Sequence, residues 1–306
     1  DSGWTHRLTA TEGRNSMAKL LRGADTARVL TERLKGEAAA LSARGVVPTL
    51  AILRVGERED DLSYERGAMK RCEQIGIAVR RFLLPSGVTQ EKLLETVDSI
   101  NADPEIDGCL IFRPLPGHLD DGQVRARLLP TKDVDGITDG SMSAVYSGSG
   151  QGFSPCTAQA CIEILKNSGI SLSGKRVTVV GRSLVIGRPA AMLLLAEHAT
   201  VTICHTRTKN LPAVCREAEI LIAAAGKAGV IGRESAAPGQ IVLDVGIHMG
   251  EDGRLCGDVR FDEVEPVVEA ITPVPGGVGA VTTSVLAGHV IEAASASRGQ
   301  TFAGRP

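Results

Sequence analysis

The apolar and polar positions alternate between helical and strand-like patterns along most of the chain. Residues 24–45 carry apolar side chains at helical spacing, and residues 49–55 form a nearly continuous apolar run typical of a buried strand. Gly76 is placed to end a helix in a left-handed conformation. The alternation continues with helices predicted at 64–75 and 90–101 and strands at 79–84 and 108–112. Repeated strand–helix units predict a parallel sheet covered by helices.

Three polar or proline-containing segments of this first half are expected to be loops. Residues 56–63 precede the helix predicted at 64–75. Residues 113–116 contain two prolines and cannot continue the preceding strand, because proline lacks the N–H group that a strand ladder uses. Residues 132–136 are expected in a similar loop. Ligands of open α/β sheets bind where such loops leave the carboxyl ends of the strands.

A stretch in the second half has the pattern of a dinucleotide fold. The β-branched run at 176–180 ends on Gly181, and helical spacing begins after Gly187, which predicts strand, tight turn and helix. A second run at 199–205 completes a βαβ unit. Glycines let the backbone approach a pyrophosphate, and the helix N-terminus supplies partial positive charge. The unit therefore predicts a dinucleotide site, although its two glycines lack the GxGxxG spacing.

The remaining segments complete a second domain. Residues 146–152 are rich in serine and glycine and form the candidate linker. Beyond it we expect a helix with a threonine cap at 157–168, buried strands at 220–225 and 240–245, a Pro/Gly-dense loop at 270–279 and a last helix at 283–296. The last helix follows the completed nucleotide domain, and we expect it to pack back on the first domain.

The patterns together predict an α/β protein with two domains. The chain of 306 residues is long enough for about two cores. Residues 17–151 with 283–300 are expected to form the N-terminal domain, and residues 152–282 a Rossmann-like nucleotide domain with a parallel sheet. Residues 1–16 are polar and precede Met17, so we interpret them as an upstream extension or a remnant of cloning.

Composition and charge narrow the possible partners. The chain is 43% hydrophobic and 23% charged, as in ordinary soluble globular proteins. Its 34 Lys and Arg against 36 Asp and Glu leave no positive excess for nucleic acid, and no apolar run reaches the roughly 18 residues that span a membrane. Seven cysteines, an odd number without a CxxC pair, favour reduced thiols and a cytoplasmic location over a disulfide framework or a metal site.

The end of the second strand in the dinucleotide unit bears on the cofactor. NAD-binding folds usually place a carboxylate there for the ribose 2′-hydroxyl, whereas residues 204–208 read Cys-His-Thr-Arg-Thr. A 2′-phosphate could be held instead by Arg182, Ser183, Thr206 and Arg207. The sequence thus favours NADP, with NAD possible. The alternatives are a solvated turn with a surface arginine and, for His205, a role in capping the strand.

Six motifs occur in order through the two domains. They are GKRVTVVGRSLVIGRPAAMLLL, ATVTICHTRT, KDVDGI, VLDVGI, GDV and ITPVPGGVGAVTT. This set resembles the methylenetetrahydrofolate dehydrogenase/methenyltetrahydrofolate cyclohydrolase family, and the similarity extends from about Gly23 to Ala294. The resemblance implies a first domain that binds a tetrahydrofolate derivative, a second domain that binds NADP, and a homodimer.

The resemblance and the residues themselves together predict the two sites. By the resemblance, Gly181, Arg182, Ser183, Thr206 and Ile247 match cofactor contacts, and Tyr64, Asp135 and the loop 273–278 match the folate side. Tyr64 and Asp135 are the candidate catalytic residues; a core tyrosine and a simple turn former are the respective alternatives. Substrate contacts are expected from Phe112, Arg113, Pro114, Pro273, Gly276, Gly277 and Val278. Cofactor contacts are expected from Gly181, Arg182, Ser183, Gly187, His205, Thr206, Arg207 and Ile247. No metal site is expected.

The folate side departs from the family pattern. Where the family has a serine before the tyrosine and a lysine four residues after it, this chain has Asp61 and Ala68. Residues four apart share a helix face, so the missing ammonium would lie beside Tyr64. Lys70 lies about 120° around the helix from that tyrosine and does not replace it. The family's VQLPLP reads IFRPLP, which puts Phe112 in place of the glutamine.

These departures affect the family's two reactions unequally. Hydride transfer from methylenetetrahydrofolate mainly needs alignment of donor and acceptor carbons. Hydrolysis of the methenyl group needs general acid–base catalysis, which the resemblance assigns to the missing lysine, tuned by the missing glutamine. Arg113 and Arg66 are poor substitutes because arginine stays protonated. We therefore predict oxidation of 5,10-methylenetetrahydrofolate to 5,10-methenyltetrahydrofolate by NADP, with weak or absent cyclohydrolase activity.

Three alternatives stay open at this point. The protein could be a bifunctional enzyme with a substitute proton relay. It could be a nucleotide-binding homologue that has lost turnover, or a Rossmann oxidoreductase acting on another substrate. Assays of the two half-reactions and competition by folates separate these alternatives.

Overall fold

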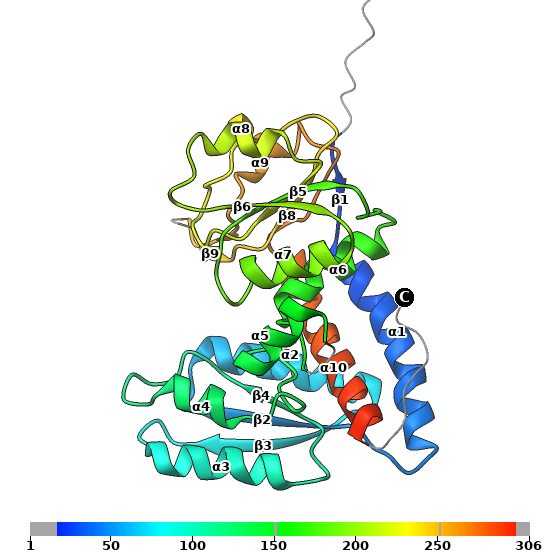
Figure 1. Cartoon of the computed structure of the whole chain (residues 1–306), viewed down its shortest axis with the longest axis vertical. Coiled ribbons are helices and arrows are strands. Elements are labelled where there is room, and N and C mark those ends of the chain that lie inside the picture. The colour runs from blue at the N-terminus through cyan, green and yellow to red at the C-terminus, as the bar shows by residue number, and fades with distance from the viewer. Residues whose placement is uncertain (1–16, 150–151, 251, 298–306) are drawn as a thin grey trace, which may run out of the picture.

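The computed structural model describes residues 17–149, 152–250 and 252–297. Two α/β halves are stacked, one around a three-stranded sheet and the other around a six-stranded sheet, with long helices between them (Figure 1). The predicted two-domain α/β class is therefore confirmed. The interpretation of residues 1–16, and the part of the predicted linker at 150–151, lie outside the described residues.

The N-terminal half is built on a parallel sheet of order β3-β2-β4, with bounds Thr49–Val55 for β2, Ala78–Leu84 for β3 and Gly108–Ile111 for β4. The central strand is fully buried because helices cover both faces. Leu50 and Ile52 point into the core shared with the helices between the halves, whereas Ala51 and Leu53 face the opposite core. This alternation is the two-residue period of a strand.

Helices predicted at 24–45, 64–75 and 90–101 are found in this half, whereas the helices at 121–127 and 139–147 were not predicted. Their bounds are Gly23–Ser42 for α1, Glu59–Ile75 for α2, Gln90–Ala102 for α3, Asp121–Arg127 for α4 and Asp139–Ser147 for α5. The predicted stop at Gly76 is confirmed, with a φ of 95°. The predicted start of α2 at Tyr64 is wrong: the helix begins at Glu59, where three acidic residues of the first turn complement its dipole. Tyr64 therefore lies inside a helix.

The second half contains a six-stranded parallel sheet of order β1-β11-β8-β7-β5-β6. The four strands β5 to β8 of this sheet span Arg176–Val180, Thr200–Cys204, Ile220–Ala223 and Ile241–Asp244 in that order. The predicted βαβ unit is confirmed, with α7 at Gly187–Ala196 joining β5 to β6. Because β6 and β7 lie on opposite sides of β5, the strand order reverses there, as at a dinucleotide-binding switch point.

The first strand of the chain joins the sheet of the second half. β1 (Lys19–Leu20) pairs with β11 (Ala270–Ile271), although the prediction assigns residues from Met17 onward to the first domain. A two-residue edge strand is too short to show periodicity, so only the tertiary pairing reveals it. Short elements in the same half also escaped prediction: α8 (Leu211–Arg216), β9 (His248–Met249), β10 (Leu255–Cys256) and α9 (Phe261–Val264).

Two segments near the domain boundaries differ from expectation. α5 extends to Ser147, so the first residues of the predicted linker are helical. α6 spans Cys156–Asn167 and follows Pro155, without a side-chain cap. The predicted threonine cap is wrong because Thr157 already lies in the first turn of this helix.

The last helix, α10 (Thr282–Ser297), packs against α1, α2 and α6, which confirms that it returns to the first half (Figure 1). Together with the preceding 3₁₀ helix η2 (Val278–Ala280), residues Val278–Ser297 are long and apolar enough to cross a membrane, which corrects the expectation that no segment reaches this length. However, 72% of the apolar window is buried inside the protein, as in a core helix.

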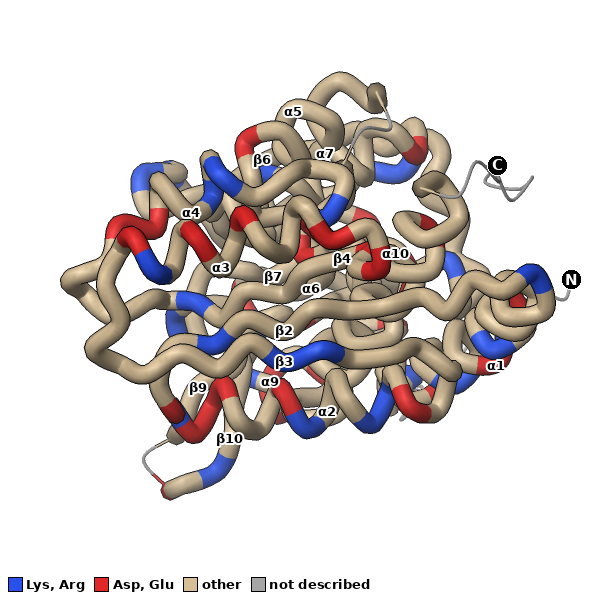
Figure 2. Tube along the Cα trace, turned by 90° about the horizontal axis from the view of Figure 1, so that it is seen from below, with Lys and Arg blue, Asp and Glu red and all other residues tan. Residues whose placement is uncertain are grey.

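Acidic and basic side chains are interspersed over the surface. In the view of Figure 2, both signs occur along α2, α3 and α4. Several form surface ion pairs, such as Arg80 with Asp103 at 2.8 Å. This mixture agrees with the small net charge of the sequence.

Candidate active site

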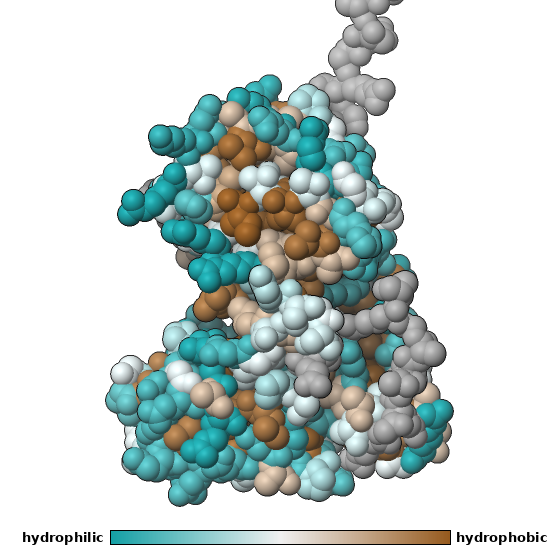
Figure 3. All heavy atoms as spheres, in the orientation of Figure 1, coloured by the Kyte–Doolittle hydropathy of each residue, from teal (hydrophilic) through white to brown (hydrophobic). Residues whose placement is uncertain are grey.

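A cavity of about 650 Å³ lies between the two halves. The N-terminal half contributes α2, the loop after β4 and the segment 135–142, and the second half contributes Leu184 and Val185 from the turn after β5. Figure 3 shows the surface hollowed between the halves. The cavity is large enough for a drug-sized ligand and is open to the dinucleotide half.

Tyr64 and Phe112 form the apolar wall of the cavity. Their rings meet edge to face, with centroids 6.0 Å apart and planes at 80°. Burial is the main cause that raises the pKa of Tyr64 well above its ordinary value, and the neighbouring Cys156 and Asp135 raise it further. A hydrogen bond with Thr282 acts in the opposite direction. The phenol therefore keeps its proton near neutral pH. Because it lines the cavity, Tyr64 is placed to contact a ligand.

Asp135 lies across the same cavity, and its neighbour Asp133 shapes the loop. The Asp133 carboxylate accepts the backbone N–H groups of Ile137 at 2.9 Å and Thr138 at 2.7 Å. Asp133 is thus the turn former, and Asp135 faces the cavity. Burial raises the pKa of Asp135 to about 6, opposed by a hydrogen bond from Cys156. A carboxyl group with this pKa changes charge in the range useful for acid–base chemistry.

Two side chains that received no role from the sequence support this loop. Cys156, at the start of α6, contacts the Asp135 carboxyl and places its sulfur 3.4 Å from the carbonyl oxygen of Val134. His289 of α10 places Nδ1 2.8 Å from the same oxygen. These contacts join α6 and α10 to the loop. No local sequence signal shows them, because the residues are more than 20 positions apart along the chain.

The position at which the sequence resemblance predicts a lysine contains a small side chain. Ala68 is 1% exposed and packs in the core below the cavity, one helical turn after Tyr64. Lys70 is exposed and does not line the cavity. Within the described residues, the cations that line the cavity are Arg58, Arg113 and Arg125. The cavity therefore contains no lysine ammonium from the residues described.

The arginine that follows Phe112 is held by an ion pair. Arg113 donates from Nη2 to Asp121 at 2.6 Å, and Arg125 donates to the same carboxylate at 2.9 Å. Hydrogen bonds from Arg113 hold the pKa of Asp121 below its usual range. Arg113 is thus fixed at the cavity wall in a charge pair.

The turn after β5 is tightly packed around its two glycines. Gly181 has a φ of 131°, and a side chain there would collide with the carbonyl oxygen of Ala224. A side chain at Gly187 would collide with the carbonyl oxygen of Gly181. Ser183 accepts the N–H of Ile186 at 3.1 Å and so shapes the turn before α7. This arrangement brings the N-terminus of α7 to the edge where a pyrophosphate binds in such folds.

The segments that follow β5 and β6, residues 181–188 and 205–210, contain no Asp or Glu. Exposed side chains there are Arg182, Ser183, Thr206 and Arg207. His205 is half-buried. Its ring Nδ1 accepts the backbone N–H of Arg207 at 3.2 Å, and its backbone N–H donates to the hydroxyl of Thr208 at 2.8 Å. These bonds favour the capping role for His205. Two exposed guanidinium groups without a carboxylate fit a ribose 2′-phosphate.

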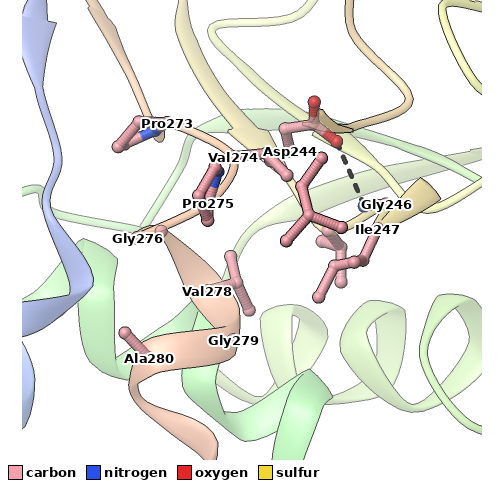
Figure 4. Close-up of a pocket in the computed structure, with 13 residues that line it drawn as sticks. Asp244, Gly246, Ile247, Pro273, Val274, Pro275, Gly276, Val278, Gly279 and Ala280 are labelled. Atoms are coloured by element: carbon pink, nitrogen blue, oxygen red, sulfur yellow. Dashed lines mark hydrogen bonds between the residues drawn. The ribbon is translucent and has the colours of Figure 1, made fainter. Parts of the chain in front are cut away.

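A second pocket, of about 290 Å³, lies beside the end of β8 (Figure 4). The residues predicted for substrate in the Pro/Gly-dense loop line this pocket together with Ile247: Pro273, Gly276, Gly277 and Val278. The structure therefore brings Phe112, Arg113 and Pro114 together with Tyr64 and Asp135, but it does not bring the loop residues into the same cavity.

Two buried carboxylates organise the loops around this second pocket. Asp244 accepts N–H groups from Gly246 at 3.1 Å, drawn in Figure 4, and from Asp258 at 2.9 Å. Asp258 in turn accepts the N–H of Gly226 at 3.0 Å and contacts His248 Nε2 at 2.7 Å. The aspartates of VLDVGI and GDV thus hold loops by hydrogen bonds, a role that the motifs alone did not reveal.

Comparison with known families decides the relationship of the chain. Residues 21–135 match the family model described as tetrahydrofolate dehydrogenase/cyclohydrolase, catalytic domain, and residues 155–298 match its NAD(P)-binding domain. The chain belongs to the tetrahydrofolate dehydrogenase/cyclohydrolase family. The NAD(P)-binding match covers the βαβ unit at Gly181 and extends through α10.

Curated relatives within the family are similar along nearly their whole length. The bifunctional protein FolD of Carboxydothermus hydrogenoformans is 52% identical over 279 residues, covering 90% of this chain and 97% of the relative. The bifunctional protein FolD of Clostridioides difficile is 47% identical over 279 residues, covering 91% and 97%.

Solved structures of family members have the same fold. The bifunctional FolD enzyme of Campylobacter jejuni is 35% identical, with a TM-score of 0.88 over 91% of this chain and 99% of that one. The Trypanosoma brucei enzyme, solved with NADP and an inhibitor, is 33% identical, with a TM-score of 0.86 over 93% and 99%.

Among the described residues, no group of three or more His, Cys, Asp or Glu side chains is arranged to hold a metal ion.

Proposed function

We propose that the protein oxidises 5,10-methylenetetrahydrofolate to 5,10-methenyltetrahydrofolate with NADP. The observation that carries this proposal is the cavity between the halves. It combines Tyr64, Phe112 and Asp135 of the catalytic half with the turn that follows β5 in the nucleotide half. A folate in this cavity lies next to the half that binds the nicotinamide cofactor in the family.

The chemistry requires few protein groups for hydride transfer. A hydride leaves the methylene carbon between two folate nitrogens, and the cofactor, when bound, accepts that hydride. The nitrogen lone pairs stabilise the resulting cation, so the residues of the cavity mainly align the folate and exclude water. The Tyr64 ring and the Phe112 ring supply an apolar wall for this alignment.

NADP is the preferred cofactor in this proposal. The exposed Arg182 and Arg207 follow adjacent strands in segments that contain no Asp or Glu, which supports this preference. The T. brucei relative was solved with NADP, which is in line with this preference. We expect the enzyme to use NAD as well, with a Michaelis constant higher than that for NADP.

The second reaction of the family is proposed to be slow. Water attack on the methenyl cation needs proton transfer, and Ala68 occupies the position of the family lysine in a buried environment. Several relatives, however, carry the name bifunctional. Of the four aspartates that line the cavity, Asp61 and Asp135 have pKa values that burial raises. Hydrolysis through one of these carboxyl groups is therefore the second candidate.

One pair of assays tests the proposed function. The formation of NADPH on adding methylenetetrahydrofolate measures the dehydrogenase, and the decay of methenyltetrahydrofolate measures the cyclohydrolase. We expect turnover in the first assay, faster with NADP than with NAD, and hydrolysis close to the spontaneous rate in the second. Efficient hydrolysis would establish the second candidate, whereas no NADPH formation would refute the main proposal.

We also propose a cytoplasmic homodimer. All seven cysteines are free thiols, in agreement with a reducing compartment. The edge strand β6 and the adjacent helix α7 expose Ile203 and Leu195 at 38% and 57%, and Figure 3 shows apolar side chains gathered on this half. An exposed edge strand with apolar neighbours is a surface for pairing with a second copy. Light scattering of the purified protein should give twice the chain mass, and a monomer would refute the dimer.

A further inference from the structure

Asp61 is a buried acid in the wall of the proposed folate cavity. Its side chain lines the cavity and the residue is only 6% exposed. It lies three residues before Tyr64, so both side chains occupy one face of α2. The family pattern has serine at this position, so Asp61 adds a negative charge. Because Ala68 also removes a positive one, the wall is more negative than the family pattern implies.

Among the described residues, the carboxylate of Asp61 has no hydrogen-bonded partner of its own, although the charges of Arg58 and Arg54 lower its pKa. Within the described residues, no hydrogen bond or ion pair joins this carboxylate to another side chain. The hydrogen bonds of these two arginines go elsewhere: Arg58 donates to the carbonyl oxygen of Pro114 at 3.2 Å, and Arg54 donates to Glu65 at 2.7 Å. Burial raises the pKa of Asp61 most and Arg58 lowers it, so the carboxylate is only partly compensated. A ligand that brings further positive charge into the cavity therefore gains from the interaction with Asp61.

The reaction proposed above produces such a charge. Methylenetetrahydrofolate is neutral at its reacting carbon, and loss of a hydride leaves one positive charge delocalised over that carbon and its two nitrogens. The hydride, with its two electrons, passes to the oxidised nicotinamide. Positive charge therefore develops on the folate during the step, and a nearby fixed carboxylate stabilises it more than it stabilises the substrate.

We propose that Asp61 is the counter-charge for the methenyl cation and for the transition state that leads to it. This inference rests on the proposed dehydrogenase function and adds a residue to it. The charged residues that line the cavity are four aspartates and three arginines, namely Asp60, Asp61, Asp135, Asp139, Arg58, Arg113 and Arg125. The cation would therefore lie among carboxylates that outnumber the guanidinium groups by one. Asp61 departs from the family pattern.

The test compares two folates that differ in charge. Methenyltetrahydrofolate is a cation, and tetrahydrofolate lacks that charge. Isothermal titration calorimetry measures the binding of each without cofactor, at a low temperature where spontaneous hydrolysis is slow. For Asp61→Asn and Asp61→Ser we expect the dissociation constant of the cation to rise about tenfold or more, as for loss of one charged interaction. The constant for tetrahydrofolate should change less than about twofold.

The control removes the same charge from the same helix. Glu59 is exposed in the first turn of α2 and does not line the cavity. Glu59→Gln should leave both dissociation constants unchanged. The single-turnover rate of NADPH formation should fall by about tenfold or more in the Asp61 variants and stay constant in the control.

Each alternative outcome is decisive. Equal weakening of both folates by Asp61→Asn and Asp61→Ser, or no weakening of either, would overturn the counter-charge and leave the dehydrogenase proposal intact. If the unmodified protein bound neither folate and formed no NADPH, the proposed function itself would fail. Thermal melting of each variant shows whether it is folded, and Asp61→Ser, with the residue of the family pattern, provides a second folded variant.

Discussion

The ring of Tyr64 contacts the ring of Phe112 edge to face across the wall of the central cavity, with centroids 6.0 Å apart. The resemblance noted in the sequence predicts a glutamine at the position of Phe112 and a lysine one helical turn after the tyrosine. In this chain Phe112 packs against Tyr64 and Ala68 is buried one turn further along α2. The contact thus links the two departures that bear on hydrolysis.

Restoring the lysine tests that link directly. Ala68→Lys should raise the rate of methenyl hydrolysis by about tenfold or more, because a positioned acid–base group contributes at least that much. The double variant Ala68→Lys with Phe112→Gln should gain further. Gly67→Lys adds the same charge at an exposed position of α2 and serves as the control. No gain in either restored variant would mean that the missing lysine is not what limits hydrolysis.

Activity should depend on the ionisation of Asp135. Its pKa is raised to about 6, first by burial, so the carboxylate predominates at pH 7 and is lost as the pH falls through 6. If the carboxylate binds the folate, kcat/KM for methylenetetrahydrofolate should fall below pH 6. Asp61, whose pKa is also raised by burial, lines the same cavity, so the profile is measured in the Asp61→Asn background as well. A profile unchanged by Asp135→Asn would exclude this role.

Cofactor preference should depend on the two exposed arginines. Arg182→Ala or Arg207→Ala should raise the Michaelis constant for NADP by about tenfold or more through loss of a charge-assisted phosphate contact. The constant for NAD should stay nearly the same. Arg176→Ala, at the opposite end of β5, provides a matched control. Parallel losses with both cofactors would show that the arginines do not select the 2′-phosphate.

A buried ion pair anchors the helix that carries Tyr64. The side chains of Arg54 and Glu65 are 4% and 5% exposed, with Nε and Oε2 2.7 Å apart, and Arg81 lies 3.0 Å from the same carboxylate. Glu65→Ala should lower the free energy of unfolding by about 3–5 kcal/mol, because it leaves Arg54 buried and unpaired. Glu32→Ala, which breaks the exposed pair with Lys35, should cost less than about 1 kcal/mol. Urea unfolding measures both, and similar losses would contradict the argument.

The turn at Gly181 should tolerate no side chain. Gly181→Ala combines a φ of 131° with a collision against the carbonyl oxygen of Ala224, so we expect a loss of about 2 kcal/mol or more in stability and weaker NADP binding. Gly174→Ala is the comparison: its φ is also positive, at 75°, but no atom lies near the added carbon. An equal effect at both positions would mean that backbone strain, rather than close packing, makes Gly181 necessary.

Local sequence patterns predicted much of the fold. Strand β2 was predicted with the observed bounds, and the β5–α7–β6 unit with its glycine turn was predicted from apolar periodicity. These elements are long or strongly patterned, so the order of apolar and polar residues predicts which side chains are buried. The absence of a carboxylate after β6 and the substitutions at positions 61 and 68 are also properties of the sequence itself.

The tertiary structure decided which of these residues share a site. It paired β1 with β11, started α2 at Glu59 and placed Asp61 in the cavity wall. It also separated the Pro273–Val278 side chains from the cavity of Tyr64 and supported the Asp135 loop by Cys156 and His289. Such relationships join residues far apart in the chain. Periodicity reports which face of an element is buried, but only packing determines what that face contacts.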